Sequence, residues 1–118
     1  MLLRIGALAT FALTFIPSAF AQTSTYLMNE GGQTGKLTIV RQSDGSMAVE
    51  AGFGVPGRCL GNIKGRGSQK GSTIIVRAEP PCTLTIDVKG NTAVVREDNC
   101  GMWHGPSCMA DGTYKLAK

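Results

Sequence analysis

Aromatic residues and histidine are scarce in this sequence, and their scarcity excludes several classes of function. Its 118 residues include one Trp, two Tyr, four Phe and a single His. One histidine does not allow a Ser-His-Asp set to be nominated, and a few scattered aromatic residues do not form a stacking platform for single-stranded nucleic acid. A glycine-rich phosphate loop ending in Lys-Ser or Lys-Thr is also missing. We therefore expect neither an enzyme nor a cofactor-binding protein.

Basic residues are in modest excess but form no run. Twelve Lys and Arg against eight Asp and Glu give a formal net charge of +4. Without a clustered basic stretch this charge does not predict a nucleic-acid partner, although it leaves room for an acidic protein or an anionic glycan. The single histidine has no Cys-x-x-Cys pair beside it, so no metal site is expected.

Long hydrophobic runs are missing except near the N-terminus. Residues 5–16 are almost wholly apolar, and a small-x-small cleavage site ends at Ala21. The run is too short to span a bilayer comfortably, so residues 1–21 are predicted to be a signal peptide rather than an uncleaved anchor. Because Gln22 and not a cysteine follows, no lipid anchor is expected. The prediction is a single domain at residues 22–118, periplasmic or secreted, without a membrane anchor, as a monomer or homodimer.

After the predicted signal peptide, short segments of alternating apolar and polar residues are separated by turn residues, which is typical of strands. The clearest alternation places Leu84, Ile86 and Val88 on one face, and Asp44-Gly45 is a strong hairpin signal. Strands are expected at residues 23–29, 36–41, 47–53, 59–64, 73–78, 82–88, 92–97 and 113–117.

These segments predict an all-β fold, because no stretch carries apolar residues at a helical period for ten residues. An open sheet of this length would expose its edges, so closure is expected. Consecutive hairpins favour a small antiparallel up-and-down barrel of seven or eight strands, with a two-sheet sandwich as the alternative.

The chain has four cysteines, and in an exported protein they predict two disulfides. They are Cys59, Cys82, Cys100 and Cys108. All three pairings are possible from the sequence. We favour Cys59–Cys82, which begin the fourth and sixth strands, and Cys100–Cys108, which close a short loop. Because the core is made mostly of aliphatic side chains in a small domain, the bridges are expected to decide whether the chain folds.

The segment between Cys100 and Cys108 is the first candidate binding site. Trp103 and His104 are the only residues of their kinds in the chain, and they are adjacent. A cross-linked loop loses little entropy on binding and tryptophan is a common interface anchor, so the pair is predicted to insert into a partner's cleft. In the alternative, structural interpretation, Trp103 caps the barrel end and His104 hydrogen-bonds a loop carbonyl.

The glycine-rich segment at residues 61–72 is the second candidate site. It holds Lys64, Arg66 and Lys70 and contains no acid. We predict a flexible cationic loop suited to an acidic cleft, where exclusion of water strengthens charge pairing. The alternative is a solvated hairpin turn whose charges keep the protein soluble.

The C-terminal pattern supports a family comparison. A disulfide-bonded strand meander ending in Cys100, seven residues, Cys108 and Met-Ala-Asp-Gly-Thr-Tyr resembles the small periplasmic inhibitors of c-type lysozyme and their lipoprotein relatives. The resemblance covers most of residues 22–118 in size, strand number and cysteine use, and it implies an antiparallel β-barrel. The family's longer inhibitory motif is not found, so the roles of its Ser and Lys are assigned to no residue here. A second inhibitor family presents a histidine from a cysteine-bounded loop, and His104 is similar to that device by analogy.

The resemblance implies a protein that inhibits c-type lysozyme by blocking the acidic active-site cleft with a protruding loop. Lysozyme cleaves between two carboxyl groups, which the imidazole of His104 or the cations of residues 61–72 would contact. The alternative is a non-enzymatic envelope protein that binds an anionic glycan or a surface partner through residues 61–72. Glycan binding would weaken steeply with salt and leave lysozyme activity unchanged.

Overall fold

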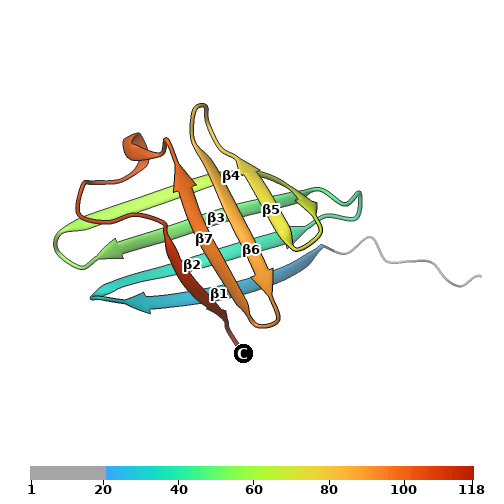
Figure 1. Cartoon of the computed structure of the whole chain (residues 1–118), viewed down its shortest axis with the longest axis horizontal. Helices are drawn as coiled ribbons and strands as arrows, with labels where there is room; N and C mark the ends of the chain where they lie inside the picture. Colours follow the sequence, from blue (N-terminus) through green and yellow to red (C-terminus); the bar gives the residue numbers. More distant parts are fainter. Residues whose placement is uncertain (1–20) are drawn as a thin grey trace, which may run out of the picture.

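The computed structural model describes residues 21–118, which form an antiparallel barrel (Figure 1). Its strands are β1 (Gln22–Glu30), β2 (Gln33–Arg41), β3 (Met47–Val55), β4 (Cys59–Lys70), β5 (Thr73–Arg77), β6 (Thr83–Lys89), β7 (Thr92–Asp98) and β8 (Gly112–Leu116). A short 3-10 helix, η2 (Gly101–Trp103), lies between β7 and β8. Each strand pairs with the next along the chain and β8 closes against β1, so the expected all-β up-and-down barrel is confirmed.

The predicted signal peptide falls almost entirely on residues 1–20, which lie outside the described residues. Within the part of the chain that the structure describes, no helix is long and apolar enough to cross a membrane.

The strands form two groups that cross each other, β1–β4 and the steeper β5–β8 (Figure 1). The seam between β1 and β8 is short, with Tyr26 opposite Leu116 and Leu27 opposite Lys115. At the other seam, β4 pairs with β3 over its first nine residues but with β5 only from Arg66 onward. The first half of β4 therefore has an edge without a strand neighbour, and this edge positions the candidate site.

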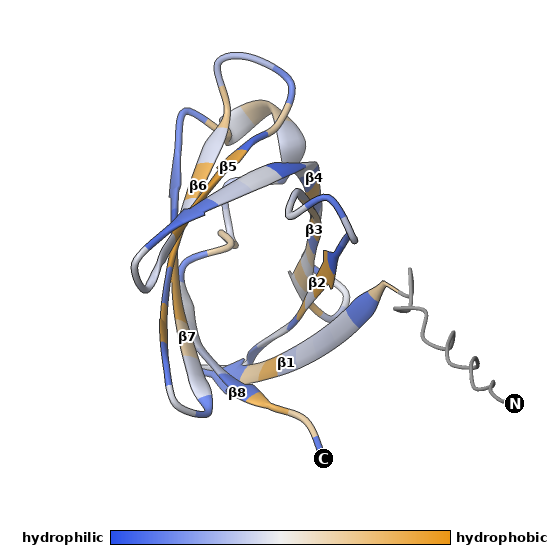
Figure 2. Ribbon diagram, turned by 90° about the vertical axis from the view of Figure 1, so that its right-hand side faces the viewer, coloured by the Kyte–Doolittle hydropathy of each residue, from blue (hydrophilic) through white to orange (hydrophobic). Residues whose placement is uncertain are grey.

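Every second residue of each strand fills the barrel interior, as strand geometry requires. Leu84 and Ile86 of β6 are fully buried, whereas Thr85 between them is only partly covered, and hydrophobic and hydrophilic positions alternate along the ribbon (Figure 2). Burial raises the pKa of Tyr114, whose hydroxyl donates a 2.8 Å hydrogen bond to the carbonyl of Ala110. Other large side chains with almost no exposed surface are Leu37, Met47, Ile63, Ile74, Val76 and Val95.

The two expected disulfides are present, but the favoured pairing is wrong. The bridges join Cys59 to Cys108 and Cys82 to Cys100. Cys82 precedes β6 and Cys100 follows β7, so these two cysteines meet at the facing ends of an antiparallel pair, with Cα atoms 4.5 Å apart.

The offset between β4 and β5 explains why Cys59 does not reach Cys82. The first residue of β6 pairs with Arg77, and Arg77 pairs with Arg66. Cys82 therefore lies near the level of Arg66, seven residues beyond Cys59 on β4 or roughly 23 Å along a strand, whereas disulfides join Cα atoms no more than about 7 Å apart. Cys59 instead meets Cys108, with Cα atoms 6.0 Å apart.

The expectation that residues 61–72 form a flexible loop is wrong, because most of this segment belongs to β4. Gly65 and Gly67 face inward, and Lys64 and Arg66 alternate with them on the outer face. A Cβ at Gly65 would overlap the backbone at the end of β5. The expectation of a loop fails because these glycines are small inward residues that let strands cross closely, rather than turn residues.

Candidate functional site

The segment between β7 and β8 lies across the open edge of β4. His104 forms an isolated antiparallel bridge with Gly61, and Cys108 is bonded to Cys59 at the start of the same strand. This close approach requires glycine, because a Cβ at Gly61 would overlap both the ring of Phe53 and the Cβ of His104. The segment thus occupies the place of a neighbouring strand.

Substitution Gly61→Ala is expected to lower the free energy of unfolding by about 1–3 kcal/mol, because the added methyl enters space held by Phe53 and His104. Urea denaturation measures the change. Gly52→Ala on β3 is the matched control, since the nearest atom to a Cβ there is Asn62 Nδ2 at 3.6 Å. Equal losses from the two substitutions would contradict the close approach at Gly61.

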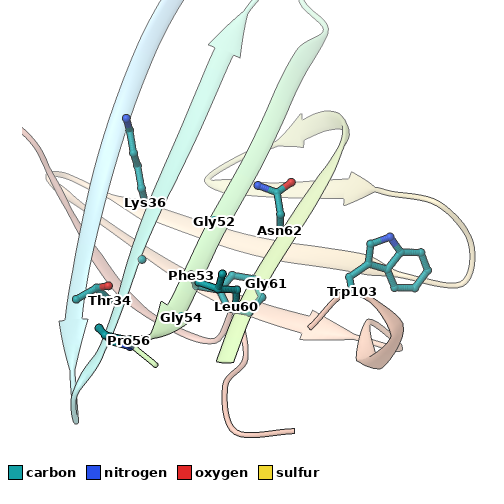
Figure 3. A pocket seen from close by; sticks show the side chains of 11 residues that line it. Thr34, Lys36, Gly52, Phe53, Gly54, Pro56, Leu60, Gly61, Asn62 and Trp103 are labelled. Atoms are coloured by element: carbon teal, nitrogen blue, oxygen red, sulfur yellow. The ribbon is translucent and has the colours of Figure 1, made fainter. Parts of the chain in front are cut away.

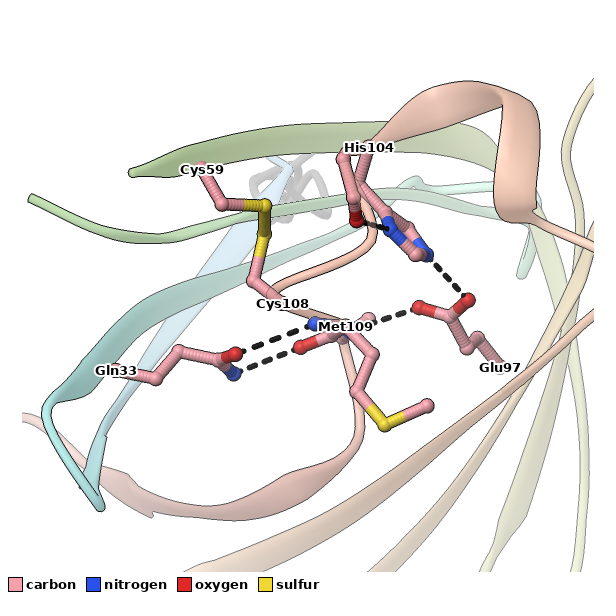
Figure 4. The surroundings of a disulfide bond; sticks show 8 residues. Gln33, Cys59, Glu97, His104, Cys108 and Met109 are labelled. Carbon is pink, nitrogen blue, oxygen red and sulfur yellow. Dashed lines mark hydrogen bonds and ion pairs between the residues drawn. A yellow bond between two sulfur atoms is a disulfide. The ribbon is translucent and has the colours of Figure 1, made fainter. Parts of the chain in front are cut away.

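Two hydrogen bonds fix the imidazole ring of His104 within this segment (Figure 4). Its Nε2 lies 2.6 Å from a carboxylate oxygen of Glu97, and its Nδ1 lies 2.6 Å from the carbonyl oxygen of Gly105. Because both partners can accept hydrogen bonds, the two contacts favour the protonated imidazole, in which both ring nitrogens donate. The side chains of His104 and Glu97 are only 9% and 8% exposed, and the imidazole meets the ring of Phe53 edge to face.

Glu97 of β7 contacts the segment between β7 and β8 at two places, His104 and Ala110. Burial lowers the pKa of His104, but the hydrogen bonds to Gly105 and Glu97, together with nearby carboxylate charge, outweigh burial and raise it. The other carboxylate oxygen of Glu97 accepts a 2.6 Å hydrogen bond from the N–H of Ala110. The N–H of Glu97 donates to Asp111 Oδ1 at 2.8 Å.

The end of the segment is also fastened to β2. Gln33 Nε2 donates to the carbonyl of Met109 at 2.7 Å, and the Met109 N–H donates to Gln33 Oε1 at 3.2 Å (Figure 4). Met109 directly follows the Cys59–Cys108 bridge. The segment is therefore tied to β2, β4 and β7, which makes it a rigid platform rather than a free loop.

The outer surface of this platform and the neighbouring start of β4 carry apolar side chains. Met102 is 88% exposed and Leu60 is 82% exposed. Trp103 packs partly against the barrel core and also lines, with Leu60, a groove on the outside of the barrel. Exposed apolar side chains that gather in one place mark interaction sites.

The groove lies on the outer face of β2, β3 and β4 and has a volume of about 680 Å³ (Figure 3). Gly52 and Gly54 of β3 form its floor, so no side chain rises between the two neighbouring strands. Its walls come from those strands, the β3–β4 turn and η2, and their side chains are Thr34, Lys36, Pro56, Leu60, Asn62 and Trp103.

The structure brings together only part of the predicted site. Trp103 lines the groove, and Lys64 and Arg66 are exposed on the outer face of β4. His104 does not project, because its ring is bonded under the segment. Lys70 lies nine residues beyond the β4 bridge to His104, roughly 30 Å along a strand, so it belongs to the other end of the molecule.

Sequence reasoning missed the groove and the partner of His104. Lys36, Gly52 and Asn62 lie opposite one another on three successive strands. The alternating pattern of β2 and β3, with the Asp-Gly hairpin between them, could have indicated that Lys36 and Gly52 lie opposite each other. No pattern in the sequence indicated that Glu97 meets His104, since this contact depends on the path of the segment across β4.

Across residues 21–118, no three His, Cys, Asp or Glu side chains gather as metal ligands. Cys100 and Cys108, which flank His104 in the sequence, are both consumed in disulfides.

Fold and site together define a small disulfide-bonded antiparallel β-barrel with a fastened segment over an open strand edge and a groove on its outer face. Comparison with protein-family models, curated proteins and solved structures finds no match to this chain.

Proposed function

We propose that the protein is an exported, non-enzymatic inhibitor of c-type lysozyme. The observation that carries this proposal is the rigid apolar surface at one end of the barrel, where Leu60 and Trp103 line the groove together and Met102, which precedes Trp103 in the chain, is exposed. A disulfide and the part-buried His104–Glu97 ion pair fasten this surface. A preorganised surface loses little entropy on binding, and tryptophan is among the residues that contribute most to interfaces.

Cationic side chains on β4 extend the proposed contact surface. Lys64 and Arg66 are exposed, and neither takes part in an ion pair within residues 21–118. They would approach the two carboxyl groups of the lysozyme cleft, where exclusion of water strengthens the attraction. Many c-type lysozymes are cationic, so the net charge of +4 does not steer the encounter and local pairing supplies the specificity.

His104 has a positioning role in this proposal. Its ring is bonded to Glu97 and Gly105, so it supports the segment that carries Trp103 instead of entering the lysozyme cleft. Export to the periplasm or the medium is part of the same proposal, and two disulfides are typical of an oxidising compartment.

The purified oxidised protein is expected to stop a c-type lysozyme from clearing bacterial cell walls at a near-stoichiometric ratio. Trp103→Ala is expected to weaken inhibition about 30-fold or more, because it removes the interface anchor. Leu27→Ala is the matched control, since Leu27 is an exposed apolar residue on β1, away from this surface. An unchanged inhibition constant for Trp103→Ala would place the contact elsewhere.

Charge reversal tests the part that β4 plays. The double substitution Lys64→Glu and Arg66→Glu is expected to weaken inhibition, whereas reversal of Lys89 and Lys115, which lie on other strands, changes the net charge equally and is expected to leave inhibition intact. Failure of the unsubstituted protein to inhibit c-type, i-type and g-type lysozymes would overturn the inhibitor proposal.

A second function, binding of an anionic glycan, is favoured by the outer face of β2–β4. Lys36, Lys64 and Arg66 lie on this face, and none forms an ion pair within the described residues. This function predicts an affinity for polyanionic saccharides that falls steeply with salt, without any effect on the rate of lysozyme.

A further inference from the structure

Gly52, on the floor of the outer groove, is not required by the fold. Its φ does not lie in the left-handed region, and a Cβ at this position would meet only Asn62 Nδ2, at an ordinary 3.6 Å. By contrast, a Cβ at Gly54 would come within 2.6 Å of the carbonyl oxygen of Cys59. Packing therefore explains Gly54 but not Gly52.

Glycine at this position is costly for the strand. Gly52 lies inside β3, which is paired along its length with β2 and β4. A glycine within a strand costs about 0.5–1 kcal/mol relative to alanine, and β-branched residues are favoured there. What the missing side chain provides is open space between Lys36 on β2 and Asn62 on β4, the residues paired with Gly52 on its two sides.

The groove walls combine an aromatic ring with hydrogen-bonding groups of both kinds. Lys36 supplies an ammonium donor and Thr34 a hydroxyl. The amide nitrogen of Asn62 is the atom nearest to the space above Gly52, and it donates one N–H to Glu50 Oε2 at 2.9 Å, which leaves its second N–H as a donor. Trp103 supplies an aromatic wall at the η2 side (Figure 3).

The backbone of the groove floor is already paired. The β2–β3 and β3–β4 ladders run past Gly52 on both sides, so an extended peptide cannot add to this face as a strand through main-chain hydrogen bonds. A ligand here is held by side chains alone. An aromatic side chain with a hydroxyl, an amide N–H and a cation suits a molecule that has an apolar ring face, many hydroxyl groups and a negative charge.

We propose that this groove binds an oligosaccharide that carries carboxylate groups. One sugar ring lies over Gly52 with its carboxylate paired with Lys36 and its hydroxyl groups bonded to Thr34 and Asn62, and the next ring of the chain lies against Trp103 on the other side of β4 (Figure 3). The volume of about 680 Å³ lies in the range of small-molecule sites. The inference rests on the second proposed function, glycan binding, and is independent of lysozyme inhibition.

Trp103 provides a direct readout, since it is the only tryptophan in the chain. Tetragalacturonic acid is expected to change its fluorescence in a saturable way, and isothermal titration calorimetry gives the affinity independently. The uncharged tetra-N-acetylchitotetraose, called chitotetraose below, is expected to bind more weakly, because it has no carboxylate for Lys36. Tetraglutamate, an acidic peptide without sugar rings, is expected not to bind.

Gly52→Val fills the groove and is expected to abolish saccharide binding while it preserves or raises the melting temperature, because valine suits a strand. Ala48→Val is the matched control, since Ala48 lies on the same outward face of β3 outside the groove. Lys36→Gln is expected to lower the affinity for tetragalacturonic acid about tenfold and to leave chitotetraose unchanged. Lys89→Gln, with the same change in net charge, is its control.

The outcomes separate the groove from the glycan-binding function itself. Binding that survives Gly52→Val but is lost on charge reversal of Lys64 and Arg66 would retain glycan binding and overturn the groove as its site. Equal affinity for tetraglutamate would overturn the saccharide as the ligand. Should Gly52→Val fail to fold, Gly52→Ala and Lys36→Gln decide by the same criteria, and a protein that binds none of the saccharides overturns both proposals.

Discussion

Replacement of Cys59 and Cys108 by alanine is expected to lower the free energy of unfolding by about 4 kcal/mol. The bridge joins residues 49 apart in the sequence, so its removal restores the freedom of a long loop to the unfolded chain. It also releases the segment that covers the open edge of β4. Urea denaturation of the oxidised protein measures the loss, and inhibition of lysozyme should weaken in the same variant.

The second disulfide is the matched control for this experiment. Cys82 and Cys100 are 18 residues apart, so their replacement is expected to cost about 3 kcal/mol. The bridge joins the ends of β6 and β7, which are already held together by their ladder. Lysozyme inhibition per folded molecule should therefore survive its loss. A larger functional effect at Cys82–Cys100 than at Cys59–Cys108 would contradict the role assigned to the covering segment.

Strand number and barrel closure were predictable because side-chain alternation and turn residues are local signals. Apolar and polar residues alternate cleanly at residues 82–88, and the bounds of β6 agree with this range to within one residue at each end. Each hairpin also states which strands are neighbours, since a short turn leaves no other pairing. Local patterns thus carried the order β1 to β7, whereas β8 follows the long segment at residues 99–111 and its place was inferred from the need to close the sheet.

The disulfide pairing was not predictable because it depends on a long-range offset. Cys59 begins β4 as expected and Cys82 directly precedes β6, but the extension of β4 beyond β5 separates them by seven residues along the strand. The expected strand ended at residue 64, because glycines hid the continuation of β4 through residues 65–70, where β5 pairs with it. Counted as small inward residues, Gly61, Gly65 and Gly67 continue the alternation that Cys59 and Ile63 begin.

In the candidate site, too, features that depend on residue type were predictable and features that depend on long-range contacts were not. Trp103 and the β4 cations could be nominated from residue type alone, and the structure leaves Trp103 half-buried at the groove and the cations exposed. The covered position of the His104 ring could not be predicted from the sequence, because its carboxylate partner comes from β7 and the residues that cover it come from β3 and β4. A polar residue that is rare in a chain is as suited to a buried structural role as to an exposed functional one.

Substitution Glu97→Ala is expected to lower the free energy of unfolding by about 1.5–3 kcal/mol, because it leaves the part-buried imidazole of His104 without its charged hydrogen-bond partner. It also removes the acceptor of the Ala110 N–H. Glu97→Gln keeps an acceptor oxygen and is expected to lose less. The double substitution Glu97→Ala and His104→Ala should cost less than the sum of the two single changes, since it removes both charges together. Strict additivity would contradict the ion pair.

The same pair makes stability depend on pH. Glu97 from β7 and Asp111 ahead of β8 face His104, whereas Phe53 of β3 and Gly61 of β4 contribute no charge. Because the pKa of His104 is raised above its ordinary value of 6.5, its contribution is complete below that value and is lost as the pH rises through the folded-state pKa. Urea denaturation at about pH 5.5 and about pH 9 should therefore show a loss of stability that is absent from His104→Gln. A His104→Gln variant with the same pH dependence as the unsubstituted protein would assign the titration to another group. If the loss is specific to His104, the segment that carries Trp103 is fastened most firmly on the acidic side of neutrality, and both proposed binding functions should be strongest there.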